Sequence, residues 1–164
     1  MQRSRGFTIM ELLIGIAILA ILTVVALPNF IAFTQNNRLA AQANELVATL
    51  QYARSEALKR GVDVQICSSA SGTACDGDWN DGWVAVADPD ATDPQLLRVW
   101  QSPGGDFSFD PPAGTVRFEN DGVSSVDAEQ TFRLQLASCT NDNARIIAIQ
   151  NTGRVSAERA QCSG

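Results

Sequence analysis

The sequence predicts an α+β fold in which one long, kinked N-terminal helix packs on a small antiparallel β domain. Three patterns lead to this prediction: an apolar run at residues 7–33, an amphipathic helical pattern at residues 34–60, and short runs of period two within residues 62–157. The expected organisation is a leader at residues 1–6, a transmembrane half of the helix, and one domain at residues 34–164, because about 130 residues suffice for a single modest core.

The apolar run carries one charge, Glu11, and then continues without charge from Leu12 to Asn37. About twenty apolar residues, at roughly 1.5 Å rise each, match a hydrocarbon layer about 30 Å thick. The run can therefore span a membrane as one helix, and a carboxylate at its edge is a functional candidate because an unpaired one is costly there. The alternative is a simple signal anchor whose Glu11 reaches the lipid head groups.

The segment before the apolar run, residues 1–6, is short and basic. Arg3 and Arg5 favour a cytoplasmic start, and the small residue Gly6 precedes the apolar core, whereas an ordinary secretory signal is cut after its core. Cleavage after Gly6 would keep the helix and create an α-amino group on Phe7. At a spacing of four residues, that cation and the Glu11 carboxylate lie on one helical face.

Downstream, the helix changes character at Pro28, where a missing backbone hydrogen bond predicts a kink. Apolar residues then recur at spacings of three and four, which indicates an amphipathic stripe. Gly61 predicts the helix end, so the helix is expected to extend from Phe7 to Arg60. The residues of the stripe are Leu39, Ala43, Leu46, Leu50, Ala53 and Ala57.

After residue 61 the period becomes two, and turn residues separate the runs. Such runs predict an antiparallel sheet packed on the stripe. The expected strands are Val62–Cys67, Val84–Ala87, Leu96–Trp100, Gly114–Glu119, Thr131–Cys139, Arg145–Gln150 and the short Arg154–Ala157.

The segment Gly6-Phe7-Thr8-x-x-Glu11, followed by the apolar run and Pro28, resembles the class III signal of type IV pilins and type II secretion pseudopilins. Further segments resemble the GspH/FimT subfamily of minor pilins and pseudopilins, which includes FimU-like proteins. These segments are Asn36-Asn37-Arg38-Leu39, the stretch from Leu50 to Ala57, and Gly82-Trp83-Val84.

The resemblance implies a pilin fold with two small sheets and a set of partners. A prepilin peptidase would cut after Gly6 and N-methylate Phe7, and Glu11 would pair with the N-terminal amine of a neighbouring subunit during assembly. The implied partners are other major and minor pilins or pseudopilins, through the N-terminal helix, and the inner-membrane assembly platform. The implied location is the bacterial inner membrane, with a single-pass anchor and a periplasmic domain, and the cell surface after assembly.

Four cysteines would face an oxidising compartment there, which favours disulfides. Proximity in the sequence suggests the pairs Cys67–Cys75 and Cys139–Cys162, although three connectivities are formally possible. A zinc site is the alternative to disulfides. However, the chain contains no histidine, and the spacing within neither cysteine pair is that of a zinc knuckle.

The loop from Asp76 to Gly82 imitates the start of a calcium loop, with Asp, Asp and Asn at its first, third and fifth positions. The match ends there, because the sixth position, where a calcium loop has glycine, is Asp81. The twelfth position, where it has a bidentate glutamate, is Ala87. The expected role is an acidic turn, and Trp79 and Trp83 are expected to pack within the domain. No metal site is expected.

The charge is acidic, at −6 for the whole chain, which argues against nucleic acid as a partner. Some FimT-like proteins bind DNA through Gly-Arg-x-Arg. This chain has Gly153-Arg154-Val155-Ser156, so only Arg154 and the more distant Arg159 remain as possible DNA contacts, and DNA binding is not favoured.

The chain shows no nucleophile elbow, Walker loop or GxGxxG segment, so neither catalysis nor a cofactor is expected. The favoured function is a minor type IV pilin, a structural subunit assembled at or near the pilus tip and priming pilus biogenesis. The alternatives are a GspH-like pseudopilin acting in type II secretion and a FimT-like DNA receptor for natural transformation.

Overall fold

The computed structural model describes residues 7–104, 107–112, 115–126, 128–139 and 143–163. The chain divides into two compact units, of which the first ends at Asn37 and the second runs from Arg38 to Gly164. The helix α1 (Ile9–Arg60) contributes to both units.

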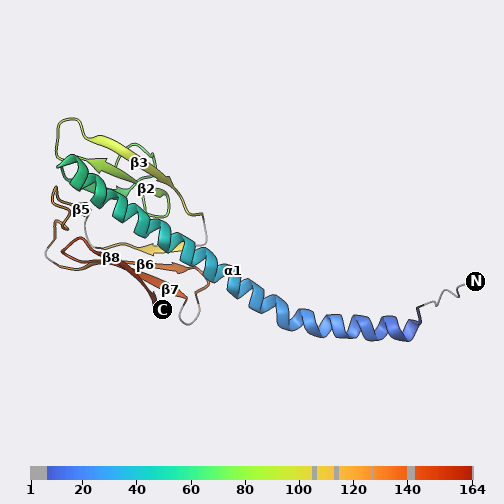
Figure 1. Cartoon of the computed structure of the whole chain (residues 1–164). Helices are drawn as coiled ribbons and strands as arrows, with labels where there is room; N and C mark the ends of the chain where they lie inside the picture. The colour runs from blue at the N-terminus through green and yellow to red at the C-terminus, as the bar shows by residue number, and fades with distance from the viewer. Residues whose placement is uncertain (1–6, 105–106, 113–114, 127, 140–142, 164) are drawn as a thin grey trace, which may run out of the picture. The chain divides into compact units, whose positions relative to one another are not determined.

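The helix α1 is continuous through Pro28 (Figure 1). It begins two residues later than the expected start at Phe7, because Thr8 lies just outside the helix and caps it. The kink at Pro28 stays a prediction. At the other end, the Gly61 amide donates to the Ala57 carbonyl oxygen at 2.9 Å, and Gly61 has a φ of 67°. This left-handed residue ends the helix where the sequence predicts.

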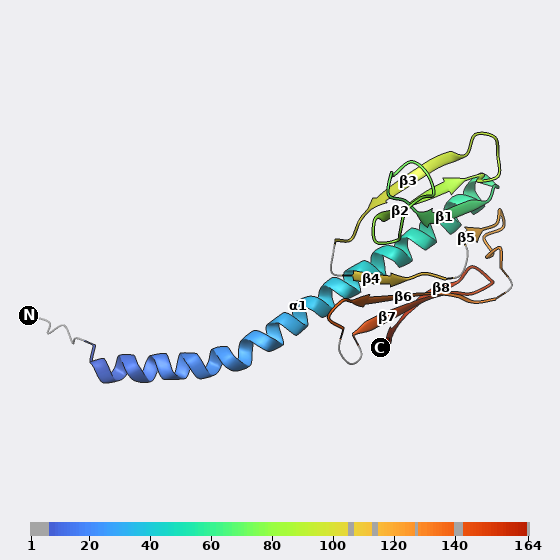
Figure 2. The ribbon, with the colours of Figure 1, turned by 180° about the vertical axis from the view of Figure 1, so that it is seen from behind.

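The second unit contains two four-stranded antiparallel sheets, which Figure 2 shows from behind. Sheet A has the order β3-β2-β1-β5 and sheet B the order β4-β6-β7-β8. The strands are β1 (Val64–Ser68), β2 (Gly82–Ala87), β3 (Gln95–Gln101), β4 (Phe107–Asp110), β5 (Val116–Phe118), β6 (Gln130–Leu136), β7 (Ala144–Ile149) and β8 (Val155–Ala160). The two sheets expected from the resemblance are confirmed.

The predicted stripe of α1 forms the centre of the core, and each of its six residues is 2% exposed or less. One apolar cluster joins this stripe to side chains of both sheets, including Trp83 of β2 and Phe132 of β6. The Trp83 indole N–H donates to the Thr49 hydroxyl oxygen at 3.2 Å, so the one polar atom of this buried ring is satisfied. Trp79 is also buried, as predicted.

A second set of contacts joins α1 to the loops at the ends of the strands. The Arg54 guanidinium donates from Nε to the Gly122 carbonyl oxygen at 2.9 Å and from a terminal nitrogen to the Thr152 carbonyl oxygen at 3.0 Å. Gly153 lies beside this contact with a φ of 75°, and a Cβ atom there would overlap the Gly122 carbonyl oxygen. Glycine is therefore required at residue 153 for packing.

The strand predictions were incomplete in one place. Strand β4 was not expected, although its sequence Phe-Ser-Phe-Asp alternates in the strand pattern and its burial alternates in the same way. The run is only four residues long, and it pairs with β6, which follows it by about twenty residues. The expected strand at Thr131–Cys139 ends earlier, at Leu136, because a turn follows.

The structure joins Cys67 to Cys75 and Cys139 to Cys162, which are the pairs suggested by proximity. Their Cα atoms lie 5.4 and 5.9 Å apart, within the usual range for a disulfide. The first bridge closes the loop between β1 and β2, and the second ties the segment after β8 to the segment after β6.

We predict that Cys162→Ser lowers the free energy of unfolding by about 3 kcal/mol, because the bridge closes a loop of 23 residues. Chemical denaturation of the full-length protein in detergent micelles would measure this change. Ser163→Ala, which keeps the bridge and removes only a hydroxyl bond to Gln135, is the control and should cost about 1 kcal/mol or less. A Cys162→Ser protein as stable as the wild type would contradict the prediction.

Candidate functional site

The first candidate site is the apolar part of α1 in the first unit. Every large apolar side chain described between Phe7 and Phe33 is at least 54% exposed. The helix is long and apolar enough to cross a membrane, and none of the most apolar window is buried within the protein. An apolar surface of this extent is unfavourable in water and is typical of segments that contact lipid or other proteins.

Two threonine hydroxyls of the first unit bond back to the helix itself. The Thr23 hydroxyl donates to the Ala20 carbonyl oxygen at 2.9 Å, and the Thr34 hydroxyl donates to the Ile31 carbonyl oxygen at 2.8 Å. Hydroxyl groups that bond back to their own helix reduce the cost of placing them in hydrocarbon. These threonines therefore suit a membrane-spanning segment.

Glu11 is bonded to Thr8 at the start of α1. The Thr8 amide and the Thr8 hydroxyl both donate to Glu11 Oε2, at 3.0 and 2.8 Å, and the Glu11 amide donates to Thr8 Oγ1 at 3.2 Å. This reciprocal pattern is a capping box, in which the cap residue and the third helical residue satisfy each other's free amides. Glu11 thus fixes the helix start.

The predictions from the sequence do not include this capping box, although the pattern Thr8-x-x-Glu11 just before an apolar run is its sequence signature. The bonds from Thr8 use only Oε2 of the carboxylate. A carboxylate offers about four acceptor positions, so Glu11 can hold Thr8 and still accept a bond from an ammonium group of another chain. Gly6, the expected cleavage residue, lies outside the described residues, and Phe7 is exposed.

The two arginines considered for DNA contact do not form one site. Arg159 is in register with Arg145 of β7, whereas Arg154 lies five positions earlier, immediately before β8. Arg154 precedes the strand, so the register of β7 and β8 does not bring it beside Arg159. Arg154 instead borders a groove of about 380 Å³ beside Arg54 and Leu58 of α1.

The carboxylates of the calcium-like loop hold backbone amides of this loop and of the residues before it. Asp76 Oδ1 accepts hydrogen bonds from the Ser71 and Ala70 amides at 3.1 and 2.9 Å, and hydrogen bonding from Ser71 is the main reason that the pKa of Asp76 lies below its ordinary value. Asp81 Oδ2 accepts from the Asp78 amide at 3.0 Å. Within the described residues, no group of three or more His, Cys, Asp or Glu side chains is placed to hold a metal ion.

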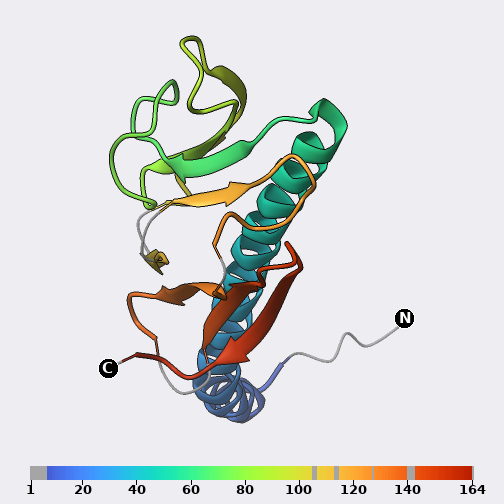
Figure 3. The same ribbon diagram turned by 90° about the vertical axis from the view of Figure 1, so that its left-hand side faces the viewer.

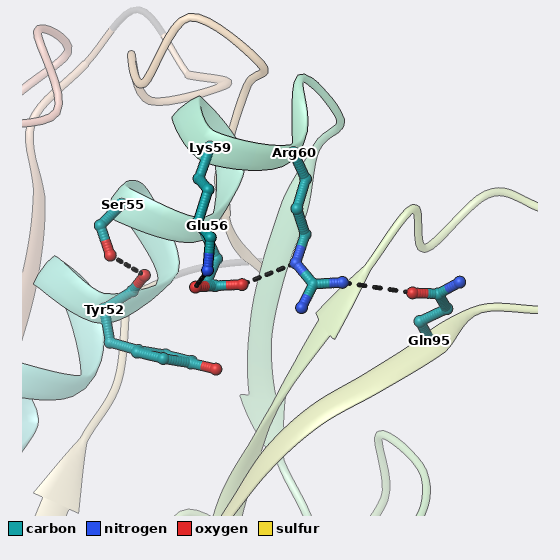
Figure 4. Close-up of polar contacts among 6 residues, drawn as sticks. All are labelled: Tyr52, Ser55, Glu56, Lys59, Arg60 and Gln95. Atoms are coloured by element: carbon teal, nitrogen blue, oxygen red, sulfur yellow. Dashed lines mark hydrogen bonds and ion pairs between the residues drawn. The ribbon is translucent and has the colours of Figure 1, made fainter.

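A charged cluster closes the last turn of α1 against β3 (Figure 4). Glu56 is only 8% exposed, and its carboxylate lies 2.6 Å from Arg60 Nε and 3.5 Å from Lys59 Nζ. Arg60 also donates to the Gln95 side-chain oxygen at 3.3 Å. The hydrogen bond from Arg60 is the main reason that the pKa of Glu56 lies below its ordinary value. The cluster joins the helix end to an edge strand of sheet A.

Comparison with known families gives two matches. The family model of the type II transport protein GspH matches residues 42–153, more than half of the chain. The model of the prokaryotic N-terminal methylation motif matches residues 1–27, which include Gly6, Phe7 and Glu11. A search of curated proteins finds no match.

Comparison with solved structures finds the type IV minor pilin FimU of Pseudomonas aeruginosa (strain PAO1), in two crystal forms. One aligns with 77% of this chain and 92% of the FimU chain, with a TM-score of 0.60. The other aligns with 73% and 92%, with a TM-score of 0.56. Sequence identity is 27% in both cases.

We predict that Thr8→Val weakens the start of α1 by about 1 kcal/mol, because loss of a cap hydroxyl leaves helix amides unsatisfied. Amide hydrogen exchange in detergent micelles should then be roughly fivefold faster at Glu11. Thr8→Ser keeps the hydroxyl and serves as the matched control, with near wild-type exchange expected. Equal exchange in all three proteins would show that the capping box contributes nothing.

We predict that Glu56→Gln makes stability less dependent on pH in acid. The pKa of Glu56 is lower in the folded protein than the ordinary value of 4.5. The ionised carboxylate therefore adds to the free energy of unfolding above pH 4.5, and this contribution disappears as the pH falls through the lower pKa of the folded state. Urea unfolding of the full-length protein from about pH 5 to pH 3 should therefore show a shallower loss of stability in Glu56→Gln. Glu45→Gln, on the same helix, is the control, and identical slopes for Glu56→Gln and wild type would contradict the prediction.

Proposed function

The chain belongs to the GspH family of type IV pilin-like proteins, and from that membership we propose that it is a minor type IV pilin. It is a structural subunit of a filament, which agrees with the family and the fold. The likeness to the minor pilin FimU over most of both chains supports the type IV pilus as the machine. We place the subunit near the tip of the pilus, where it helps to prime assembly.

The observation that carries this proposal is the uncovered apolar half of α1 with one carboxylate at its start. Before assembly, lipid covers this half, and we propose residues 7–33 as the inner-membrane span of a protein whose residues 34–164 lie in the periplasm. In the filament, the same surface packs against the N-terminal helices of other subunits. An apolar helix that is stable in lipid can exchange into a helix bundle because both surroundings are apolar.

Processing precedes assembly in this proposal. A prepilin peptidase removes residues 1–6 and methylates the amine of Phe7, as expected for the matched N-terminal methylation motif. N-methylation leaves the amine charged. The mature chain would then carry a cation at residue 7 and a carboxylate at Glu11, while the rest of the span to Asn37 remains uncharged.

Glu11 selects the assembly position by charge pairing. In an apolar bundle, an ammonium group on one subunit and a carboxylate on the next reduce each other's desolvation cost, which aligns the two helices. The bonds from Thr8 hold Oε2 in place, and the second oxygen can accept the neighbour's amine. The Glu11 carboxylate would pair with the amine of the subunit ahead of it in the filament. The outermost subunit has no subunit ahead of it, so the presence of Glu11 argues against the outermost tip position.

A second candidate is a pseudopilin of type II secretion, and the match to the GspH family model favours it. The physical mechanism is the same in both machines, because anchoring, processing and helix packing depend on the same residues. The two candidates differ in the filament that contains the protein. Recovery with sheared type IV pili supports the first, and a secretion defect on deletion with no change in piliation supports the second.

We predict that Glu11→Leu is inserted and processed but is depleted at least tenfold from sheared filaments. Leucine favours insertion, whereas the neighbour's amine loses its partner in the bundle. Immunoblots of membrane and sheared fractions would measure the ratio, and mass spectrometry would test for methylated Phe7. Thr23→Leu makes the same polar-to-leucine change within the span, keeps the carboxylate, and should assemble normally.

Recovery of Glu11→Leu in filaments at the wild-type ratio would contradict the assembly role of Glu11. Retention of residues 1–6 on the filament-associated protein would contradict the proposed processing. Absence of the wild-type protein from both type IV pili and secretion filaments would contradict the proposed function itself.

A further inference from the structure

A groove of about 380 Å³ lies between the last turns of α1 and the start of β8. Figure 3 shows the loop after β5 and the turn before β8 beside this part of the helix. The hydrogen bonds from Arg54 to the Gly122 and Thr152 carbonyl oxygens hold these segments together. Arg54 and Arg154 both line the groove, and none of the described residues that line it is acidic. The lining of the groove is therefore positively charged.

Arg54 contributes a guanidinium group that is already held in place. Its bonds to two carbonyl oxygens use two of the five N–H donors of a guanidinium group and leave three for another acceptor. Both partners are neutral, so they do not compensate the positive charge. Gly153 packs against the same group, since a Cβ atom there would lie 2.9 Å from Arg54 Nε. A group fixed in this way loses little conformational entropy when a partner binds.

Arg154 adds a second, exposed cation to the groove. It directly precedes β8, and its side chain forms no hydrogen bond or ion pair with any residue that the structure describes. A guanidinium group forms paired hydrogen bonds with a carboxylate or a phosphate and attracts it by charge. Two guanidinium groups at one hollow therefore favour an anionic group with several oxygen acceptors.

Leu58 provides an apolar surface at the same groove. It is 53% exposed, and it lies so close to Gly122 that a Cβ atom there would come within 2.9 Å of it. A free inorganic anion has no use for an apolar neighbour, whereas a protein segment can place an apolar side chain on it and remove both surfaces from water. The combination of two cations with Leu58 therefore favours a carboxylate on a protein over a free anion.

Position and charge argue against lipid and nucleic acid as sources of the anion. Arg54 lies sixteen residues beyond Arg38, the first residue of the second unit, which corresponds to about 24 Å of helix. The groove is thus at the end of this unit opposite to the residue that continues into the proposed membrane span. A nucleic acid presents a continuous line of phosphates, which a chain with a net charge of −6 repels.

We propose that this groove binds the carboxylate of an Asp or Glu side chain on a neighbouring filament subunit. The carboxylate accepts hydrogen bonds from Arg54 and Arg154, and an apolar side chain next to it on the same subunit packs on Leu58. This inference rests on the proposed function, because it takes the partner from the filament. It adds a contact made by the second unit to the contacts made by the apolar part of α1.

Photocrosslinking in filament-producing cells tests the proposal directly. The full-length protein would carry p-benzoylphenylalanine at Leu58, with Ser108 as the control position, because Ser108 is exposed on strand β4 and does not line the groove. We expect residue 58, but not residue 108, to crosslink to one peptide of a filament subunit with Asp or Glu within three residues of the crosslink. Crosslinks only to lipid or DNA, to a peptide without a nearby acid, equally from both positions, or from neither would overturn the proposal.

Charge reversal gives a second measurement that does not depend on the probe. Arg154→Glu should reduce recovery in sheared filaments about tenfold, because it places a carboxylate against the carboxylate of the partner. Arg159→Glu is the matched control, since Arg159 is also exposed, lies on β8 and does not line the groove. It should assemble at the wild-type ratio. Non-reducing gels and wild-type protease resistance would confirm that both variants fold.

A charge swap tests whether the two side chains form a pair. Replacement of the crosslinked acid of the partner by Arg should partly restore the recovery of Arg154→Glu and should reduce the recovery of the wild-type protein. Failure to restore it, or recovery of Arg154→Glu at the wild-type ratio, would overturn this inference alone. Absence of the wild-type protein from filaments would instead overturn the proposed function.

Discussion

Burial of one face of α1 holds the β domain together. Leu46 and Leu50 are fully buried, and the cluster that contains them takes side chains from both four-stranded sheets. Small antiparallel sheets do not hide an apolar face by themselves, so both depend on this helix for their cores. Arg54 adds directed hydrogen bonds from the helix to two strand-end loops, which fixes how the strand ends meet it.

The same helix serves two different surroundings along its length. In its first part the large apolar side chains that the structure describes are all exposed, and the polar groups Thr8, Glu11 and Thr23 are bonded locally. In its last part the polar residue Glu56 is buried and paired with Arg60. Local hydrogen bonding suits lipid, where water is absent, and side-chain pairing suits the boundary of a water-exposed domain.

Much of the fold could be predicted because it depends on local periodicity. The stripe from Leu39 to Ala57 and the helix end at Gly61 are patterns within one element. Strand β4 was missed because four residues give a weak signal and its pairing is not local. The capping box at Thr8 was visible in the sequence but was not recognised. The hollow of about 300 Å³ lined by Ala74, Pro94 and Leu96 could not be predicted, since it depends on how the loops on either side of β2 lie against sheet A.

The positions of the disulfides determine how the domain carries mechanical load. All four cysteines are used in two bridges, and each bridge joins residues within the region that follows α1. The peptide bond after Arg60 is therefore the only covalent connection between α1 and the sheets. A force that pulls on the N-terminal part of α1 is resisted by the buried stripe, by Arg54 and by the Glu56 cluster, all of which are noncovalent. Under such a load the noncovalent packing fails before either disulfide-closed loop can open. In the proposed function, the force that extracts α1 from the membrane must therefore stay below the force that this packing resists.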